Sequence, residues 1–137
     1  MTYSTVLPMW HAVRSRFSER IEKLTTDQLS LKLGDMTIGQ LIYHTAEVEY
    51  IFADWYFDRK SEEMKSPPLT NKEDLIQFLH ESNEFFIETM KKLPEEKWHE
   101  EKKTRMGSST PLEVVGRLMY HTGIHSGQIS DIEKYGQ

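Results

Sequence analysis

The sequence predicts an all-α protein, one four-helix-bundle domain over residues 1–137, on two observations. Apolar residues recur three or four positions apart, which is helical spacing, in four separate segments. Apolar and polar residues do not alternate over any stretch long enough for a useful strand. Four amphipathic helices of about 20 residues, each about 30 Å long, bury their apolar stripes most simply by packing side by side.

The first helix is expected over residues 4–24 and the second over 37–59. The third is expected over 71–93 and the fourth over 111–134. Each segment carries large apolar side chains on one helical face. The stripe of the last segment comprises Leu112, Val115, Leu118, Ile129 and Ile132.

Three of these helices begin with the pattern of a capping box, in which a hydroxyl accepts from a backbone N–H and the side chain three residues on bonds back. The boxes are Thr37–Gln40, Thr70–Glu73 and Thr110–Glu113. Pro111 strengthens the third box, because proline at the first helical position lacks an N–H that would have no partner there.

The order in which the helices run is left open by the sequence. The connection over residues 94–109 is long enough, at about 3.3 Å per residue, to extend well beyond a helix length. One or more crossover connections are therefore compatible with the bundle, and a simple up-down-up-down order is not assured.

Composition excludes several classes of function. The net charge of −5 comes without a basic stripe, so no nucleic-acid partner is expected. The N-terminus does not resemble a signal peptide and no apolar run approaches the roughly 20 residues of a membrane span, so we expect a cytoplasmic protein with no membrane partner. Without cysteine, imidazole and carboxylate groups are left as metal ligands.

Three histidines are predicted to face the core and to share one divalent metal ion. His121 and His125 lie four residues apart, one turn apart on the same helical face, and they continue the apolar stripe of the last segment. His44 lies on the apolar face of the second segment. Each alone would suit a hydrogen-bonded core residue, but three together favour a shared ion with a vacant position, which is typical of catalytic sites.

The other histidines are weaker candidates. His11 flanks the core at most and could supply a fourth ligand, whereas His80 is expected to face solvent. His99 lies in the charged third connection, and we expect no chemical role for it.

Polar neighbours can support the three rings. Glu47 or Glu49 could bond to a ligand imidazole or act as a base, although a solvated position suits at least one of them. Gln128 lies three residues after His125 and can reach the same pocket. The catalytic base is left undecided. Three glycines in the last helix suggest close packing or a pocket, and they are Gly116, Gly123 and Gly127.

Two segments resemble the DinB-like (YfiT-like) metalloenzyme family. They are TIGQLIYHTAEVEY in the second helix and TPLEVVGRLMYHTGIHSGQI in the fourth. KLTTDQLSLKLGDMTIGQ is similar to the family's passage from the first helix into the second, so the resemblance spans nearly the whole chain.

The resemblance implies a four-helix bundle, a homodimer and a zinc or nickel ion on His44, His121 and His125. It also implies transfer or hydrolysis involving a low-molecular-weight thiol such as bacillithiol or mycothiol. Ser126 stands where many relatives have arginine, which departs from the family pattern for recognising an anionic cofactor.

Three hypotheses follow for function. The first is a metal-dependent thiol S-transferase or hydrolase, in which the ion lowers the pKa of a bound thiol or water. The second is a non-enzymatic binding or stress-response module built on a bundle dimer. The third is a bundle with three buried histidines and no metal. Imidazole also suits copper and iron, so the sequence does not choose the metal.

Overall fold

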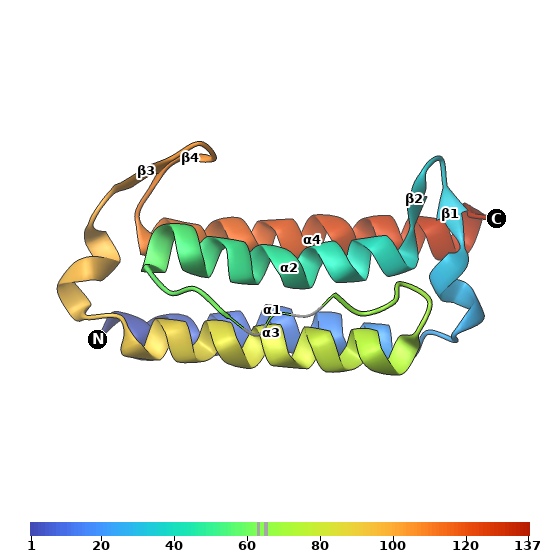
Figure 1. Ribbon diagram of the computed structural model, residues 1–137, viewed down its shortest axis with the longest axis horizontal. Helices are drawn as coiled ribbons and strands as arrows, with labels where there is room; N and C mark the ends of the chain where they lie inside the picture. Colours follow the sequence, from blue (N-terminus) through green and yellow to red (C-terminus); the bar gives the residue numbers. More distant parts are fainter. Residues whose placement is uncertain (63, 65) are drawn as a thin grey trace.

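The computed structural model describes residues 1–62, 64 and 66–137, and it contains the four expected helices (Figure 1). Their bounds are α1 Thr2–Glu22, α2 Ile38–Phe57, α3 Lys72–Lys92 and α4 Pro111–Tyr135. Each bound lies within about two residues of the expected one, which is the usual uncertainty of a helix end. The prediction of an all-α four-helix bundle is confirmed.

The helices run in an up-down-down-up order (Figure 1). α1 packs against α3 and α4, and α2 packs against the same two helices. The crossover is the connection 58–71, which returns along the length of the bundle so that α2 and α3 run parallel. The bundle therefore does contain a crossover connection, but it is not residues 94–109, the segment considered for this role from the sequence, because that segment folds up at one end of the bundle (Figure 1).

Both remaining connections contain short regular structure. Between α1 and α2 lie the 3₁₀-helix η1 Asp27–Ser30 and the strands β1 Lys32–Leu33 and β2 Met36–Thr37. Between α3 and α4 lie the 3₁₀-helix η2 Glu95–His99 and the strands β3 Lys102–Thr104 and β4 Gly107–Ser109. Each strand pair is an antiparallel ribbon of two or three residues, too short to have shown as an alternating pattern.

The capping boxes at Thr37 and Thr110 are confirmed, with both reciprocal bonds present. The box predicted at Thr70 is wrong, because the N-cap of α3 is Asn71, whose side chain accepts a 3.0 Å bond from the Asp74 N–H. Thr70 lies in the turn before the helix. Asn and Thr both favour N-caps, so adjacent candidates shift the predicted start by one residue.

The apolar stripe predicted for α4 is buried in the core, with one exception. Val115, Leu118, Ile129 and Ile132 are buried, but Leu112 is 37% exposed. Val114 occupies the core position of the first turn instead. No helix among the described residues is both long and apolar enough to cross a membrane.

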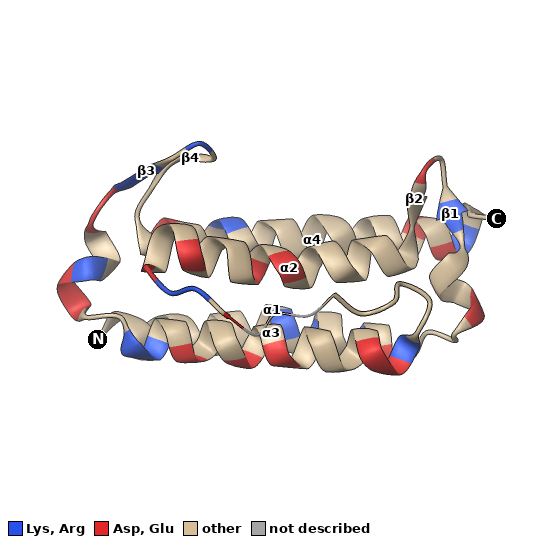
Figure 2. Ribbon diagram, viewed as in Figure 1, with Lys and Arg blue, Asp and Glu red and all other residues tan. Residues whose placement is uncertain are grey.

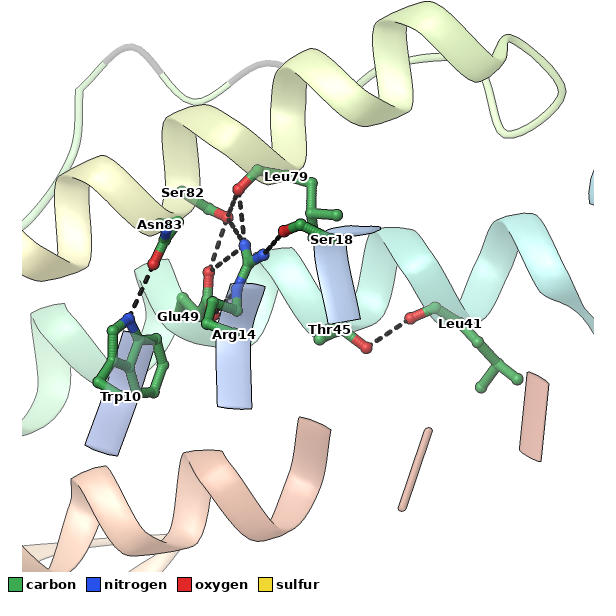
Figure 3. A network of polar contacts seen from close by, with 9 residues as sticks. All are labelled: Trp10, Arg14, Ser18, Leu41, Thr45, Glu49, Leu79, Ser82 and Asn83. Atoms are coloured by element: carbon green, nitrogen blue, oxygen red, sulfur yellow. Dashed lines mark hydrogen bonds and ion pairs between the residues drawn. The ribbon is translucent and has the colours of Figure 1, made fainter. Parts of the chain in front are cut away.

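A buried ion pair, which the sequence analysis did not foresee, crosses the centre of the bundle (Figure 3). Arg14 on α1 and Glu49 on α2 are each 1% exposed, and Arg14 Nε donates to Glu49 Oε2 over 2.7 Å. Arg14 Nη2 also donates to Glu49 Oε1 at 3.0 Å and to the Leu79 carbonyl at 2.6 Å. Ser82 of α3 donates to Glu49 Oε1 at 2.7 Å. The pair therefore ties three helices together.

Candidate metal centre

The structure brings His44, His121 and His125 together at the contact between α2 and α4. Their candidate ligand atoms all lie within 4.8 Å of one another, and they form the single such group of histidine and carboxylate side chains among the described residues. His44 comes from the first half of α2, and the other two lie one turn apart in the middle of α4. Helical spacing thus supplies two of the rings, and the packing of α2 on α4 supplies the third.

The three rings meet edge to face. The ring centroids of His121 and His125 are 4.3 Å apart, and His44 lies 4.9 Å from His121 and 5.3 Å from His125. The Nε2 atoms of His121 and His125 are 2.9 Å apart. Two nitrogens bound to one tetrahedral zinc ion at 2.0–2.1 Å lie about 3.3 Å apart, so this pair is already close to ligand geometry.

Two of the rings are held from outside by polar side chains. His44 Nδ1 lies 3.0 Å from Glu47 Oε1, and His125 Nδ1 lies 2.6 Å from Gln128 Oε1. These contacts occupy Nδ1 of both rings, so Nε2 is the nitrogen that each ring has left for binding an ion. The Nδ1 atom of His121 is buried and has no hydrogen-bond partner within the described part of the chain.

The environment favours neutral imidazole, the form that binds metals. Burial, together with smaller effects of repulsion by charge on His125 and His44, lowers the pKa of His121 to about 4. Burial also lowers the pKa of His125, against a smaller opposite effect from the Gln128 hydrogen bond. These two rings are therefore neutral at neutral pH, so an ion does not have to displace an extra proton from an imidazolium.

The site is open on one side. The His44 side chain is 45% exposed, so a small molecule can approach the rings from solvent. Tyr120 and Ile124 on α4 lie beside the histidines in sequence and are 73% and 40% exposed. The stretch of α4 that carries the histidines has few charged residues (Figure 2).

Arg117 lies one turn before His121 on α4. Its guanidinium donates to Tyr56 Oη, Ser109 Oγ and the Met106 carbonyl, and so fastens the β3–β4 ribbon to α2 and α4. The sequence analysis did not single it out, although its i, i−4 position relative to His121 places it on the same face.

Other predicted residues lie away from the rings or act differently. His11 is exposed, His80 pairs at 3.1 Å with Glu84 on the surface of α3, and His99 ends η2. None of the three belongs to the triad group. Glu49 is committed to Arg14 in the core, so its candidacy as a support or base for the triad is wrong.

The glycines of α4 do not reflect close helix packing. A Cβ atom added at Gly116, Gly123 or Gly127 would meet no heavy atom within 4 Å among the described residues, apart from the nearby backbone of its own helix. Ser126 lines a cavity of about 380 Å³ between α1 and α4, together with Arg16 and Arg20. This cavity lies on the α1 side of α4, whereas the triad lies on its α2 side.

The donor set fits a first-row divalent metal ion. Three imidazoles on one side with solvent on the other resemble the three-protein-ligand arrangement of catalytic zinc sites. The outer bonds from Glu47 and Gln128 are of the kind that orient metal-binding histidines.

Fold and site together define a class: four-helix-bundle proteins with an open, imidazole-based cluster suited to a divalent metal. The family model of the DinB superfamily matches residues 9–129. The chain belongs to the DinB superfamily, and the resemblance noted from the sequence is confirmed. Comparison with curated proteins gives no significant match.

Proposed function

We propose that this protein is a metal-dependent enzyme that holds one zinc or nickel ion on His44, His121 and His125. The observation that carries the proposal is the convergence of three imidazoles from two helices, with candidate ligand atoms within 4.8 Å of one another. Family membership supports it, because the three rings stand in the two segments that carry the family resemblance.

The reaction class proposed is thiol S-transfer or hydrolysis, with a low-molecular-weight thiol as the cosubstrate in the first case. The ion, when bound, would act as a Lewis acid that lowers the pKa of a thiol or water. The chain's own part is to hold three neutral rings in place, with Glu47 and Gln128 fixing two of them.

Metal binding is tested first, on protein purified without nickel resin. Elemental analysis should find about one zinc or nickel ion per chain, and competition with a chromophoric chelator should give its affinity. His121→Ala should lose most of this affinity. His80→Ala is the matched control, because His80 is an exposed histidine on another helix. A wild-type protein that binds no ion under these conditions would contradict the proposal.

Enzymatic activity is tested separately, with metal-loaded protein, a thiol and a reactive electrophile. Turnover that depends on both the ion and His121 supports the transferase; turnover without added thiol supports the hydrolase. Unchanged turnover in His121→Ala would rule out a metal mechanism. If the protein binds the ion tightly but catalyses neither thiol transfer nor hydrolysis, the alternative is favoured, which is a non-enzymatic binding or stress-response module.

We also propose that the chain forms a homodimer. In support, exposed apolar side chains lie on the outer face of α4, at Tyr120 and Ile124, where few charges oppose contact (Figure 2). Light scattering coupled to size-exclusion chromatography should give twice the 16.2 kDa mass of one chain. Tyr120→Glu should shift the mass towards the monomer if this face is the contact.

A further inference from the structure

The hydrogen bonds around the triad determine where each ring carries its proton. We infer that His44 and His125 are held as Nδ1–H tautomers, ready to accept an ion at Nε2, whereas His121 is held as the opposite Nε2–H tautomer. Glu47 and Gln128 are then positioning residues, and His121 must change tautomer when an ion binds. The metal-bound half of this inference rests on the proposed function.

The assignment of His44 follows from the chemistry of its partner. A carboxylate oxygen only accepts hydrogen bonds, so at 3.0 Å from Glu47 Oε1 the Nδ1 atom of His44 must donate. A neutral imidazole has one N–H, so Nε2 of His44 carries a lone pair. Nε2 is therefore the nitrogen through which His44 can join the two histidines of α4 in binding an ion.

The other two rings form a directed chain. Gln128 Oε1 is an amide oxygen and accepts at 2.6 Å, so Nδ1 of His125 donates and its Nε2 carries a lone pair. His121 Nε2 lies 2.9 Å from that lone pair and must donate to it. The proton on Nε2 leaves Nδ1 of His121 bare, which agrees with its burial without a partner in the described structure.

An ion at the triad requires a lone pair on each Nε2 atom. His44 and His125 already provide one, but His121 has to lose its Nε2 proton to solvent and gain a proton at Nδ1. No net proton is released by this exchange. The new Nδ1–H would be buried without an acceptor among the described residues.

Long-range ¹H–¹⁵N correlation spectra of metal-free protein with ¹⁵N-labelled histidine test the assignment directly. Substituting each histidine in turn assigns the signals. Nδ1–H patterns are expected for His44 and His125, and an Nε2–H pattern for His121. An Nδ1–H pattern for His121, or an Nε2–H pattern for His125, would overturn the inference.

Zinc titration then tests the exchange. All three rings should show Nδ1–H patterns in the zinc-bound protein, with His121 alone changing its tautomer. If His121 binds zinc without changing, the inference is wrong. If no ring responds to zinc, the proposed function fails while the metal-free assignment still stands, so the two failures are distinguishable.

Substitutions at the positioning residues give a second readout. Gln128→Leu removes the acceptor at His125 Nδ1, so the His125 and His121 signals should become tautomer mixtures and zinc should bind about 10- to 100-fold more weakly. Gln128→Glu keeps an acceptor and should restore both. Glu84→Gln is the control, because Glu84 is exposed and pairs with the exposed His80 ring, away from the triad. Unchanged tautomers and affinity in Gln128→Leu would refute a positioning role.

Discussion

The buried pair of Arg14 and Glu49 offers a sharp test of what holds the bundle together. Both side chains are 1% exposed, and Glu49 receives two bonds from the guanidinium, at 2.7 and 3.0 Å. In Arg14→Met, the carboxylate of Glu49 keeps the bond from Ser82 but loses its counter-charge. An unpaired buried charge is strongly unfavourable, so this variant should lose much of its stability.

The size of the loss follows from measurements on comparable pairs. Removing one partner of a buried ion pair costs about 3–5 kcal/mol. Unfolding entropy is about 2.1 cal/mol/K per residue, or about 0.29 kcal/mol/K for the 137 residues of this chain. The midpoint of thermal unfolding should therefore fall by about 10–17 °C.

Urea unfolding followed by circular dichroism measures the free energy directly. The double variant Arg14→Met, Glu49→Met is the control, because removing both charges should recover much of the loss. Zinc affinity should be unchanged in Glu49→Gln, since this carboxylate belongs to the core pair and not to the triad. A loss below about 1 kcal/mol in Arg14→Met, or no recovery in the double variant, would refute the reasoning.

Three further predictions concern pH, glycine and capping. The pKa of His121 in the folded protein is about 4, below its ordinary 6.5. The metal-free protein should therefore lose about 1–2 kcal/mol of unfolding free energy as the pH falls from 6.5 to 4, because the unfolded chain takes up the proton first. Urea titrations at several pH values measure this loss, and a flat profile would contradict the prediction. Gly39→Ala should cost about 1–3 kcal/mol of unfolding free energy, because its Cβ would lie 2.1 Å from the Leu69 carbonyl oxygen. Gly123→Ala should instead stabilise the protein by about 0.5–1 kcal/mol, because alanine favours a helix interior and nothing obstructs its Cβ. Equal thermal midpoints for the two variants would refute this contrast. Thr110→Ala should cost about 1 kcal/mol in urea unfolding, and Thr110→Ser much less; equal losses would argue against the cap.

Local sequence signals predicted the helices well because each signal acts within a few residues. Apolar periodicity and capping boxes report on one helix at a time, and the boxes at Thr37 and Thr110 marked the starts of α2 and α4 correctly. The start of α3 moved from Thr70 to Asn71 because two neighbouring residues can both cap.

Topology depends on information that those signals lack. Residues 58–71 and 94–109 are both long enough to span a helix, yet only the first does so (Figure 1). The second is shortened by η2 and by the β3–β4 ribbon, whose strands are too short to be seen as alternation. The pairing of Arg14 with Glu49 was missed for a related reason, since it joins helices whose relative positions the sequence does not give.

Helical geometry alone is enough to choose Glu47 over Glu49 as the carboxylate that supports His44. At 100° per residue, Glu47 lies about 60° around α2 from His44, while Glu49 lies about 140° away. Only Glu47 shares the histidine's side of the helix, and the structure places it 3.0 Å from His44 Nδ1. The choice between these two acids therefore follows from the sequence once His44 is taken as a ligand. The proton positions do not, because they depend on which atoms Glu47 and Gln128 present to the rings, and only the packing of α2 against α4 fixes that.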